Sequence, residues 1–262
     1  MVRVCVIGLG TVGHPTAKRI KRYHEVYGYD VDPSKVRNRG YFATTQWEHI
    51  YDIDVFVICV NTWWKEKPDM SAVRKVMEMI KEKSTPNTLV TIESTLSIGA
   101  CREFFKEIFD GQIMLSCCPH RYWEKDSKNY GVAQLRVLGG VDDDSLEVST
   151  SFYRSIKVPI YVVPYVEIAE MSKLVENAYR FVEIAFVEEL KGICEENNID
   201  LEEIRMACNT KWNVDLLEAR DGIVGSCLPK DIRILNHLAS FAPLLQGAIK
   251  ADIQYKGRLL RR

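Results

Sequence analysis

Four side chains in the second half of the sequence have types and spacing that could carry chemistry at a carbonyl carbon. Lys173 and Asn177 are four residues apart in a helical pattern, so they share one face, where a cation beside an amide donor could stabilise a developing oxyanion. Cys227 follows Gly225-Ser226, two small residues that allow close approach, and a thiolate beside a lysine is a competent nucleophile for an aldehyde. Asp231, four residues after Cys227, could lie within reach on the opening turn of a helix. Composition alone leaves open that Cys227 is a core thiol and that Lys173 is a solvated helix residue.

A second pattern, at the amino end, predicts a dinucleotide site. Gly8-Leu9-Gly10-Thr11-Val12-Gly13 follows an apolar run and opens a helical pattern, and Asp30 ends the next expected strand, 17 residues beyond Gly13. Gly8 permits the tight turn, Gly10 lets a pyrophosphate approach the backbone, and Gly13 allows close helix–strand packing. The helix N-terminus adds free N–H groups and a positive dipole end. Asp30 would bind ribose hydroxyls and repel a 2′-phosphate, which favours NAD over NADP. The alternative is a structural glycine turn in a domain that has lost its ligand.

Strands that alternate with helices must position these residues in the first part of the chain. Apolar runs typical of buried strands occur at 2–7, 26–30, 54–60, 88–93, 113–116, 135–138 and 160–163. Helical periodicity occurs at 12–23, 70–83 and 98–108. This alternation predicts an α/β fold in which an N-terminal Rossmann domain has a doubly wound, mostly parallel sheet. We expect this NAD-binding domain to span residues 1–164.

The pattern changes after Pro164, and residues 165–262 are expected to form a helical domain. A helical pattern runs from 166 to about 198, which corresponds to about 50 Å at 1.5 Å per residue, longer than one small domain needs. Shorter helices are expected at 201–207 and from 231 to about 242, and the basic end, 256–262, is expected to be a solvated tail. Because the long helix is apolar around much of its surface, we expect it to be covered by its own copy in a homodimer.

The composition excludes several classes of function. The net charge of −1 is close to neutral and argues against a nucleic-acid partner. Eight cysteines without a Cys-x-x-Cys pair argue against a zinc site, so no metal is expected, and they fit reduced thiols in a cytosolic protein. No signal peptide and no apolar run of membrane-spanning length is visible. We expect a cytoplasmic protein with a small-molecule substrate and no membrane partner.

Three later segments, at 169–179, 184–195 and 225–231, carry a resemblance to a known family. They contain Lys-x-x-x-Asn and Gly-Ser-Cys-x-x-Lys-Asp. Together with Val60-Asn61-Thr62, Glu93-Ser94-Thr95 and the glycine-rich turn, they resemble the nucleotide-sugar dehydrogenases, the UDP-glucose and UDP-N-acetylmannosamine 6-dehydrogenase family. The resemblance follows almost the whole chain in order.

The resemblance implies two successive NAD-dependent oxidations of a sugar primary alcohol, to the aldehyde and then to the acid, through a thiohemiacetal and thioester on Cys227. It implies that Asp231 and Thr95 hold a water near the site. Thr95 and Asp231 could instead be helix N-caps without chemistry. The cofactor-binding residues expected on this basis are Gly8, Gly10, Thr11, Val12, Gly13, Asp30, Val60, Asn61, Thr62 and Thr95.

The chain departs from the family in two features that concern the third domain and thioester hydrolysis. Members usually carry a third, Rossmann-like domain that helps to hold UDP, and only 35 residues follow Cys227. We interpret the chain as a short form that lacks this C-terminal domain or borrows it from another chain. In the loop that is Pro-Glu-Phe-Leu-like in the family, His120 replaces the first glutamate, which the family uses around thioester hydrolysis, and Glu124 keeps the second. His120 could serve as the base near neutral pH, or it could simply cap the loop.

Further departures concern substrate binding. Residues 219–224 stand where the family favours Pro-Gly-x-Gly, and Asn213 stands where many members have a substrate-binding arginine. Trp63-Trp64 replaces the usual Pro-Thr, and two tryptophans could stack on a ligand or cover exposed surface. A smaller or different alcohol is therefore an open alternative as the substrate.

Two other functions stay open. The β-hydroxyacid dehydrogenases share a Rossmann domain, a long helix and a Lys-x-x-x-Asn pair, and they transfer a single hydride. The chain could also be a non-catalytic NAD-binding remnant that serves as a regulatory or scaffold subunit. The Gly-Ser-Cys-x-x-Lys-Asp segment favours the two-step oxidation, and the joint presence of Lys173, Asn177, Cys227 and Asp231 argues against a remnant. We therefore expect an NAD-dependent dehydrogenase.

Overall fold

The computed structural model describes residues 1–65 and 67–261 and divides the chain into two compact units. Unit 1 is Met1–Lys173 and unit 2 is Leu174–Arg262. The division falls inside one helix, α6 (Val166–Glu196), whose first two turns belong to unit 1. The domain boundary expected at 164/165 stays a prediction.

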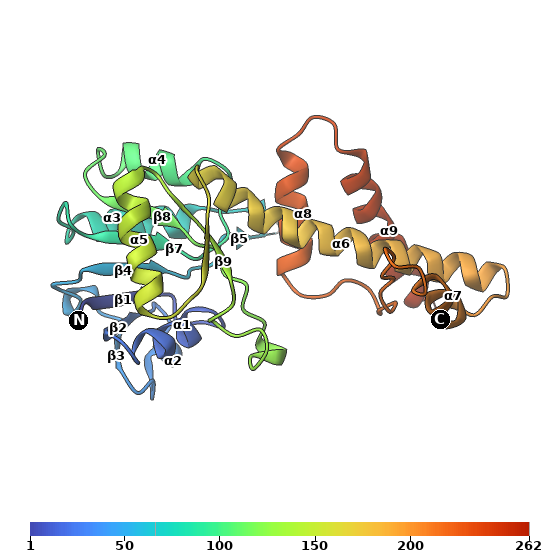
Figure 1. The fold of residues 1–262 in the computed structure, drawn as a ribbon, viewed down its shortest axis with the longest axis horizontal. Helices are drawn as coiled ribbons and strands as arrows, with labels where there is room; N and C mark the ends of the chain where they lie inside the picture. The colour runs from blue at the N-terminus through green and yellow to red at the C-terminus, as the bar shows by residue number, and fades with distance from the viewer. Residues whose placement is uncertain (66, 262) are drawn as a thin grey trace. The chain divides into compact units, whose positions relative to one another are not determined.

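Unit 1 is built on one eight-stranded sheet in the order β10-β9-β8-β7-β4-β1-β2-β3 (Figure 1). Its strands are β1 (Arg3–Ile7), β2 (Glu25–Tyr29), β3 (Phe42–Thr44), β4 (Val55–Ile58), β7 (Leu89–Ile92), β8 (Met114–Cys117), β9 (Arg136–Gly140) and β10 (Ile160–Val162). Neighbouring strands are parallel, except that β8 and β9 are antiparallel. This arrangement confirms the α/β fold with a doubly wound, mostly parallel sheet.

Helices cover both faces of this sheet. They are α1 (Gly13–Ile20), α2 (Pro33–Val36), α3 (Ser71–Lys81), α4 (Ala100–Glu107) and α5 (Asp143–Ser155). Met77 of α3 and Phe104 of α4 lie in one apolar core, whereas Ala17 of α1 and Tyr153 of α5 lie in the other. Figure 1 shows α5 across one face, with α3 and α4 on the far side. Two single 3-10 turns, Trp47–His49 and Glu124–Asp126, and a two-stranded hairpin, β5 (Trp63–Trp64) with β6 (Lys67–Pro68), complete the unit.

The start of α6 is part of unit 1. Val166 and Ala169 lie in the same apolar core as α3 and α4. Glu170 is fully buried and accepts hydrogen bonds from the N–H groups of Gly99 (2.6 Å) and Cys101 (2.8 Å). A carboxylate at the free N–H groups of a helix satisfies them and favours the helix dipole, so Glu170 caps α4.

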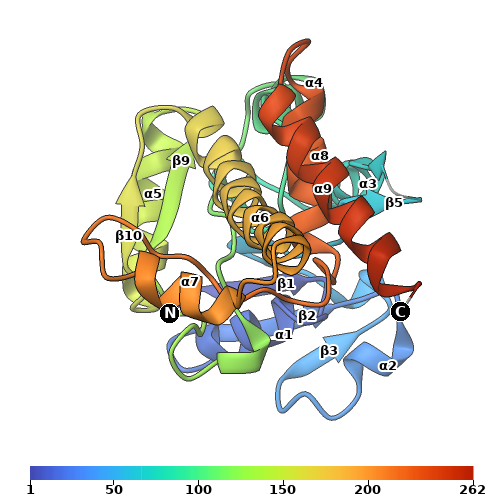
Figure 2. The same ribbon diagram turned by 90° about the vertical axis from the view of Figure 1, so that its right-hand side faces the viewer.

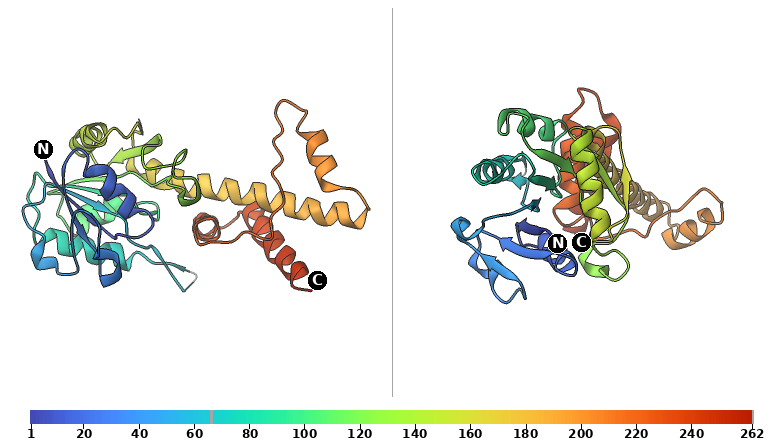
Figure 3. Two further views of the ribbon diagram at one scale, coloured as in Figure 1. Left: turned by 90° about the horizontal axis from the view of Figure 1, so that it is seen from below. Right: turned by 60° about the vertical axis from the view of Figure 1, so that its left-hand side comes forward.

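Unit 2 contains the rest of α6, then α7 (Leu201–Cys208), α8 (Cys227–His237) and α9 (Pro243–Leu259). Its core joins Phe181 and Ile184 of α6 to Ile223, Ile232 of α8 and Ala248 of α9. Figure 2 shows α8 and α9 on one side of α6, and Figure 3 shows α7 turning back at the end of α6. In the described ranges 1–65 and 67–261, no helix is both long and apolar enough to cross a bilayer.

Three sequence-based assignments of secondary structure are corrected. The helix expected from 231 begins at Cys227, because Pro229 lies in its first turn, where a missing N–H costs nothing. The expected solvated tail at 256–262 is wrong up to Leu259, because α9 includes it. Helix α5 was not expected, since two of its four buried residues, Ser145 and Ser149, are polar and weaken the apolar periodicity.

Candidate active site

The glycine-rich turn lies between β1 and α1, and its three glycines have different surroundings. Gly8 has a φ of +88°, and a Cβ there would lie 2.6 Å from the Cys59 carbonyl oxygen. At Gly13 a Cβ would lie 1.8 Å from the Gly8 carbonyl oxygen, so only glycine lets α1 pack this closely on the turn. A Cβ at Gly10 would meet nothing within 4 Å. The fold itself therefore requires Gly8 and Gly13, whereas Gly10 leaves space at the helix N-terminus that a phosphate could occupy.

Asp30 follows β2 and faces this turn. Its Oδ2 accepts a hydrogen bond from the Leu9 N–H (2.7 Å) and its Oδ1 accepts one from the Asp32 N–H (2.9 Å). The half-buried carboxylate is thereby fixed beside the turn. Each carboxylate oxygen has lone pairs for further donors, so Asp30 can still accept ribose hydroxyls.

The other expected cofactor residues follow the neighbouring strands β4 and β7. Val60, Asn61 and Thr62 come after β4, and Thr95 comes after β7. The Ser94 hydroxyl donates to the Val60 carbonyl (2.7 Å) and ties the two strand ends together. Because β2, β1, β4 and β7 are consecutive parallel strands, their carboxyl ends share one edge of the sheet. The structure therefore brings all the expected cofactor-binding residues to that edge, which is where open α/β sheets bind ligands.

A buried polar network beneath this edge was missed by sequence reasoning. The Glu93 carboxylate, at the end of β7, accepts hydrogen bonds from Thr16 (3.1 Å) and Tyr153 (3.0 Å) and pairs with Arg136 (2.8 Å). All four side chains are almost fully buried. They lie in α1, directly after β7, at the start of β9 and in α5, so the network links the helix of the glycine-rich turn to two strands and to α5.

His120 lies against this network and contacts the backbone of its own loop. Its Nδ1 accepts the Tyr122 N–H (2.8 Å), and its Nε2 lies 3.1 Å from the Thr16 hydroxyl and 3.5 Å from Glu93. Burial, together with Arg136 and Lys173, lowers the pKa of His120 well below its usual range. A neutral ring whose Nδ1 accepts a backbone N–H carries its proton on Nε2. This geometry favours the capping alternative over the role of a base, which stays a prediction, and leaves the exposed Glu124 as the carboxylate of this loop.

In unit 2 the structure brings two of the expected catalytic elements together. Asn177 of α6 donates a hydrogen bond to Asp231 of α8, whose carboxylate is fully buried. Lys230, itself buried, forms an ion pair with the other oxygen of Asp231. Asp231 lies inside α8, and the N-cap of α8 is Ser226, so Asp231 is not a helix cap. Thr95 is not the cap of α4 either, since that position is Gly99.

Cys227 is the first residue of α8, one helical turn before Asp231, so both side chains lie on one face of the helix. All eight cysteines are free thiols, and only Cys208 and Cys227 are exposed. Lys173 and Asn177 likewise lie one turn apart on the continuous helix α6. The convergence of Cys227, Asn177 and Asp231 on Lys173, Thr95 and the cofactor-binding edge stays a prediction.

The loop before Cys227 is held by α9, which sequence reasoning also missed. The Ile223 N–H donates to Asp252 (2.8 Å), and Lys256 donates to the Ile223 carbonyl (2.7 Å) and to Asp252 (2.8 Å). Gly222 has a φ of +89° and packs on the Lys256 side chain. Lys256, expected in a solvated tail, and Asp252 therefore hold the carbonyl and the N–H of Ile223, four positions before the cysteine.

Asn213 and the Trp63-Trp64 pair are the remaining positions at which the sequence departs from the family pattern. Asn213 is exposed in the irregular segment after α7. Trp63 is half-buried and Trp64 is 64% exposed in the β5–β6 hairpin, where the Asn61 side chain donates to the Trp63 carbonyl (2.8 Å). The exposed Trp64 ring leaves both of its expected roles, stacking on a ligand and covering surface, open.

Comparison with known proteins agrees with this geometry. The family model for the NAD binding domain of the UDP-glucose/GDP-mannose dehydrogenase family matches residues 37–157, and that for its central domain matches residues 167–252. UDP-N-acetyl-D-mannosamine dehydrogenase of Methanocaldococcus jannaschii is 30% identical over 94% of this chain and 64% of its own length. Protein CapL of Staphylococcus aureus is 29% identical over 90% of this chain and 62% of its own. This chain thus spans less than two thirds of the length of either relative.

A solved structure shows the same fold. The UDP-D-ManNAc dehydrogenase of Pyrococcus horikoshii superposes with a TM-score of 0.89 at 25% identity, covering 97% of this chain and 68% of the other. The two family models together match most of the chain, in the order expected from the sequence motifs. Unit 1 accordingly carries an NAD-binding domain, and the chain belongs to the UDP-glucose/GDP-mannose dehydrogenase family.

Proposed function

We propose that the protein oxidises the primary alcohol of a nucleotide-linked sugar to the carboxylate, with NAD as the hydride acceptor and Cys227 as a covalent nucleophile. The observation that carries this proposal is the hydrogen bond between Asn177 and Asp231. It joins the helix of the Lys-x-x-x-Asn motif to the helix that Cys227 begins, so two residues 54 positions apart in the chain form one cluster in unit 2.

The residues at the sheet edge fit NAD. Gly10 leaves the α1 N-terminus open for the pyrophosphate, and Asp30 offers lone pairs to the ribose while its charge repels a 2′-phosphate. Val60, Asn61, Thr62 and Thr95, after the next strands, would line the nicotinamide end. When bound, NAD supplies the acceptor for each of the two hydrides that the reaction releases.

The reaction balances in three steps. The alcohol loses a hydride from carbon and a proton from oxygen, which leaves an aldehyde. The Cys227 thiolate adds to the aldehyde carbon, and the resulting thiohemiacetal loses a second hydride and its hydroxyl proton to become a thioester. Water then cleaves the carbon–sulfur bond and releases the carboxylate and the thiol. One alcohol, two NAD⁺ and one water thus give one carboxylate, two NADH and three protons.

The side chains of α6 and α8 would act on charge and water in these steps. Lys173 and Asn177 would stabilise the oxyanion that develops when the thiolate adds. Asp231, which accepts from Asn177 and pairs with Lys230, would keep the amide oriented and, with Thr95, would hold the water for hydrolysis. Glu124 is the remaining carboxylate for proton transfer at the loop that His120 caps.

The substrate is proposed from the relatives. The relative from M. jannaschii and the solved structure from P. horikoshii are both named as dehydrogenases of UDP-N-acetylmannosamine. UDP-N-acetylmannosamine is therefore the first compound to test, followed by UDP-glucose, other nucleotide sugars and free sugars. We place the reaction in the cytoplasm, as expected from the sequence.

The test is the stoichiometry of NADH release with each substrate. We expect two NADH per sugar from the wild-type chain. Cys227→Ala should lower this four-electron turnover by about a thousandfold or more, whereas Cys208→Ala, at the other exposed cysteine, should change it by less than about twofold. Full turnover in Cys227→Ala would refute the thioester mechanism. One NADH per substrate would favour the β-hydroxyacid type of reaction, and NAD binding without turnover of any substrate would favour a remnant.

We also propose a homodimer through α6. Within unit 2, Val175, Tyr179, Phe186 and Ile193 are 43%, 65%, 58% and 51% exposed. Their spacing of four, seven and seven residues puts them on one side of the helix, as in a helix that packs on a partner. An exposed apolar stripe of this kind is typical of an interaction surface. Light scattering should show a dimer at micromolar concentration for wild type and Met206→Glu, and a monomer for Phe186→Glu/Ile193→Glu; a monomeric wild type would reject the proposal.

A further inference from the structure

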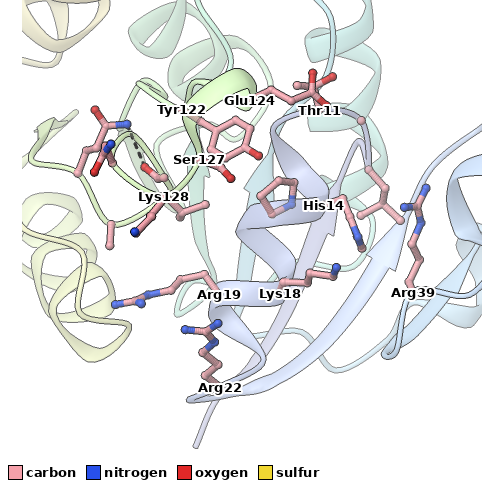
Figure 4. Close-up of a pocket in the computed structure, with 18 of the residues that line it drawn as sticks. Thr11, His14, Lys18, Arg19, Arg22, Arg39, Tyr122, Glu124, Ser127 and Lys128 are labelled. Carbon is pink, nitrogen blue, oxygen red and sulfur yellow. Dashed lines mark hydrogen bonds between the residues drawn. The ribbon is translucent and has the colours of Figure 1, made fainter.

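A pocket of about 840 Å³ lies in unit 1 beside α1 (Figure 4). It begins at Gly10 and Thr11 of the glycine-rich turn and continues along the outer side of the helix. The loop that follows His120 forms the opposite wall, with Tyr122, residues 127–129 and residues 131–134. Figure 4 shows basic side chains from three segments around this space, with His14 and Tyr122 between them.

The pocket is strongly basic. Its basic lining residues are Lys18, Arg19, Arg22, Lys35, Arg39 and Lys128. Among the described residues that line it, Glu124 is the one acid. None of the six cations forms an ion pair with a carboxylate anywhere in the described part of the chain. Arg19 is instead held by the backbone carbonyls of Ile156 (2.9 Å) and Lys157 (2.8 Å), which leave its charge uncompensated.

This positive charge extends beyond the reach of a cofactor phosphate at the helix N-terminus. Lys18 lies five residues after Gly13, which corresponds to about 8 Å along the axis, and Arg22 follows the C-terminal end of α1. The free N–H groups of a helix belong to its first turn only. The side of α1 that includes Thr16 and Ala17 is buried, whereas Lys18, on the other side of the helix, and Arg22, just after its end, are exposed.

We propose that this pocket binds a second anion, a small free molecule with two or more phosphate groups, at the same time as NAD. Six cations with one acid exceed what the two phosphates of the dinucleotide can neutralise. Flexible ammonium and guanidinium groups from separate segments are suited to phosphate oxygens. The Gly10 and Thr11 end of the pocket is left to NAD, and Lys18, Arg22 and Lys128 hold the second anion.

His14 reports on the charge in this pocket. Its ring is half-buried, and Nδ1 lies 2.9 Å from the Tyr41 hydroxyl. Burial lowers the pKa of His14, and the charges of Arg39 and Lys18 lower it further. An anion beside these two cations would offset their effect and raise the pKa of His14.

The experiment titrates inorganic pyrophosphate into the full chain that is already saturated with NAD. Calorimetry should detect binding, tripolyphosphate should bind more tightly than pyrophosphate, and both should weaken as salt is added. By NMR, pyrophosphate should raise the pKa of His14. Loss of pyrophosphate binding in the presence of NAD would overturn the proposal, because the anion would then occupy only the cofactor site.

Charge-reversal variants distinguish a specific anion site from general electrostatic attraction to the protein surface. Lys18→Glu/Arg22→Glu should weaken pyrophosphate at least tenfold, and Lys128→Glu, on the opposite wall, should weaken it independently. The matched control is Lys75→Glu/Lys106→Glu, which makes the same charge change on α3 and α4, on the other face of the sheet. An equal loss in the control would also overturn the proposal. NAD affinity should change by less than about threefold in every variant, and the thermal stability of each variant is measured alongside.

Discussion

Two buried glutamates, Glu93 in unit 1 and Glu188 in unit 2, have opposite surroundings. Glu93 in unit 1 accepts from Thr16 and Tyr153 and pairs with Arg136. Glu188 in unit 2 is equally buried, yet neither of its carboxylate oxygens has a hydrogen-bond partner in the described part of the chain. Burial and the nearby Asp252 raise the pKa of Glu188 to about 7, and Lys256 opposes this only in part.

The two sites differ in whether the buried carboxylate has partners. A buried ion that is paired and hydrogen-bonded can stay ionised, whereas an unpaired one tends to take up a proton. The Glu93 network ties four elements of unit 1 to each other at the cofactor-binding edge. Glu188 lies near the Asp252–Lys256 pair that holds the loop before Cys227, so a group with a pKa of about 7 borders the anchor of this loop.

The largest expected effect comes from neutralising Glu93. Glu93→Gln removes the partner of the buried Arg136, and an uncompensated buried charge typically costs about 3–5 kcal/mol. Hydrogen exchange of the β7 and β8 amides should show this loss of stability. Glu103→Gln, which breaks an exposed pair with Arg74, is the control and should cost less than about 1 kcal/mol. Equal effects of the two substitutions would contradict the network.

The next effect concerns the loop before Cys227. Asp252→Ala removes the acceptor of the buried Ile223 N–H and the partner of Lys256, which should cost about 2–3 kcal/mol in unit 2. Alkylation of Cys227 should change in rate, because the loop loses its anchor, whereas alkylation of Cys208 should not. An unchanged rate at Cys227 would show that α9 does not position this loop.

Glu188→Gln should have a smaller effect of opposite sign. The pKa of Glu188 is raised in the folded state, so its ionisation destabilises the fold. The free energy of unfolding therefore falls as pH rises from about 4.5 to about 7. The substitution should therefore stabilise α6 and α9 by about 1–3 kcal/mol at pH 8 and by much less at pH 5. Urea unfolding at the two pH values measures this difference. A stabilisation that is the same at both values would mean that the charge of Glu188 is not its cause.

Tyr153→Phe should have the smallest effect. It removes one donor to Glu93 and leaves Arg136 and Thr16 in place, so the loss should be about 1 kcal/mol. If the loss matched that of Glu93→Gln, the phenol rather than the ion pair would hold the network together. Thermal unfolding of the two variants side by side makes the comparison.

Local patterns in the sequence predicted the fold well where the signal for a helix, strand or turn lies within its own residues. The apolar runs predicted every strand of the sheet except β3, and the glycine-rich turn predicted the cofactor-binding edge, because each signal lies within a few residues. Helix α9 could not be predicted in this way, since Gly247, Gly257 and its basic residues interrupt the apolar pattern. Arg136 was also missed, because an arginine in a strand indicates a solvent-facing position until its partner is known.

The same limit applies to the candidate site. Lys173 and Asn177 could be paired from their spacing, and the link between Asn177 and Asp231 was expected only as convergence within the resemblance. The anchor of Ile223 by Asp252 joins residues 29 apart, and the pair of Glu93 and Arg136 joins residues 43 apart. Neither spacing has a periodicity, so these contacts follow from how the elements pack rather than from any motif.

The position of Glu170 determines where the cofactor domain can be separated from the rest of the chain without loss of stability. A fragment that stops at Pro164 would lose the carboxylate that covers the amino end of α4 and the two apolar residues that fill the core beneath it. Exchange of the cofactor domain between relatives should therefore be made at residue 173, where the first turns of the long helix travel with the sheet. A junction placed at the end of the last strand would yield an unstable hybrid.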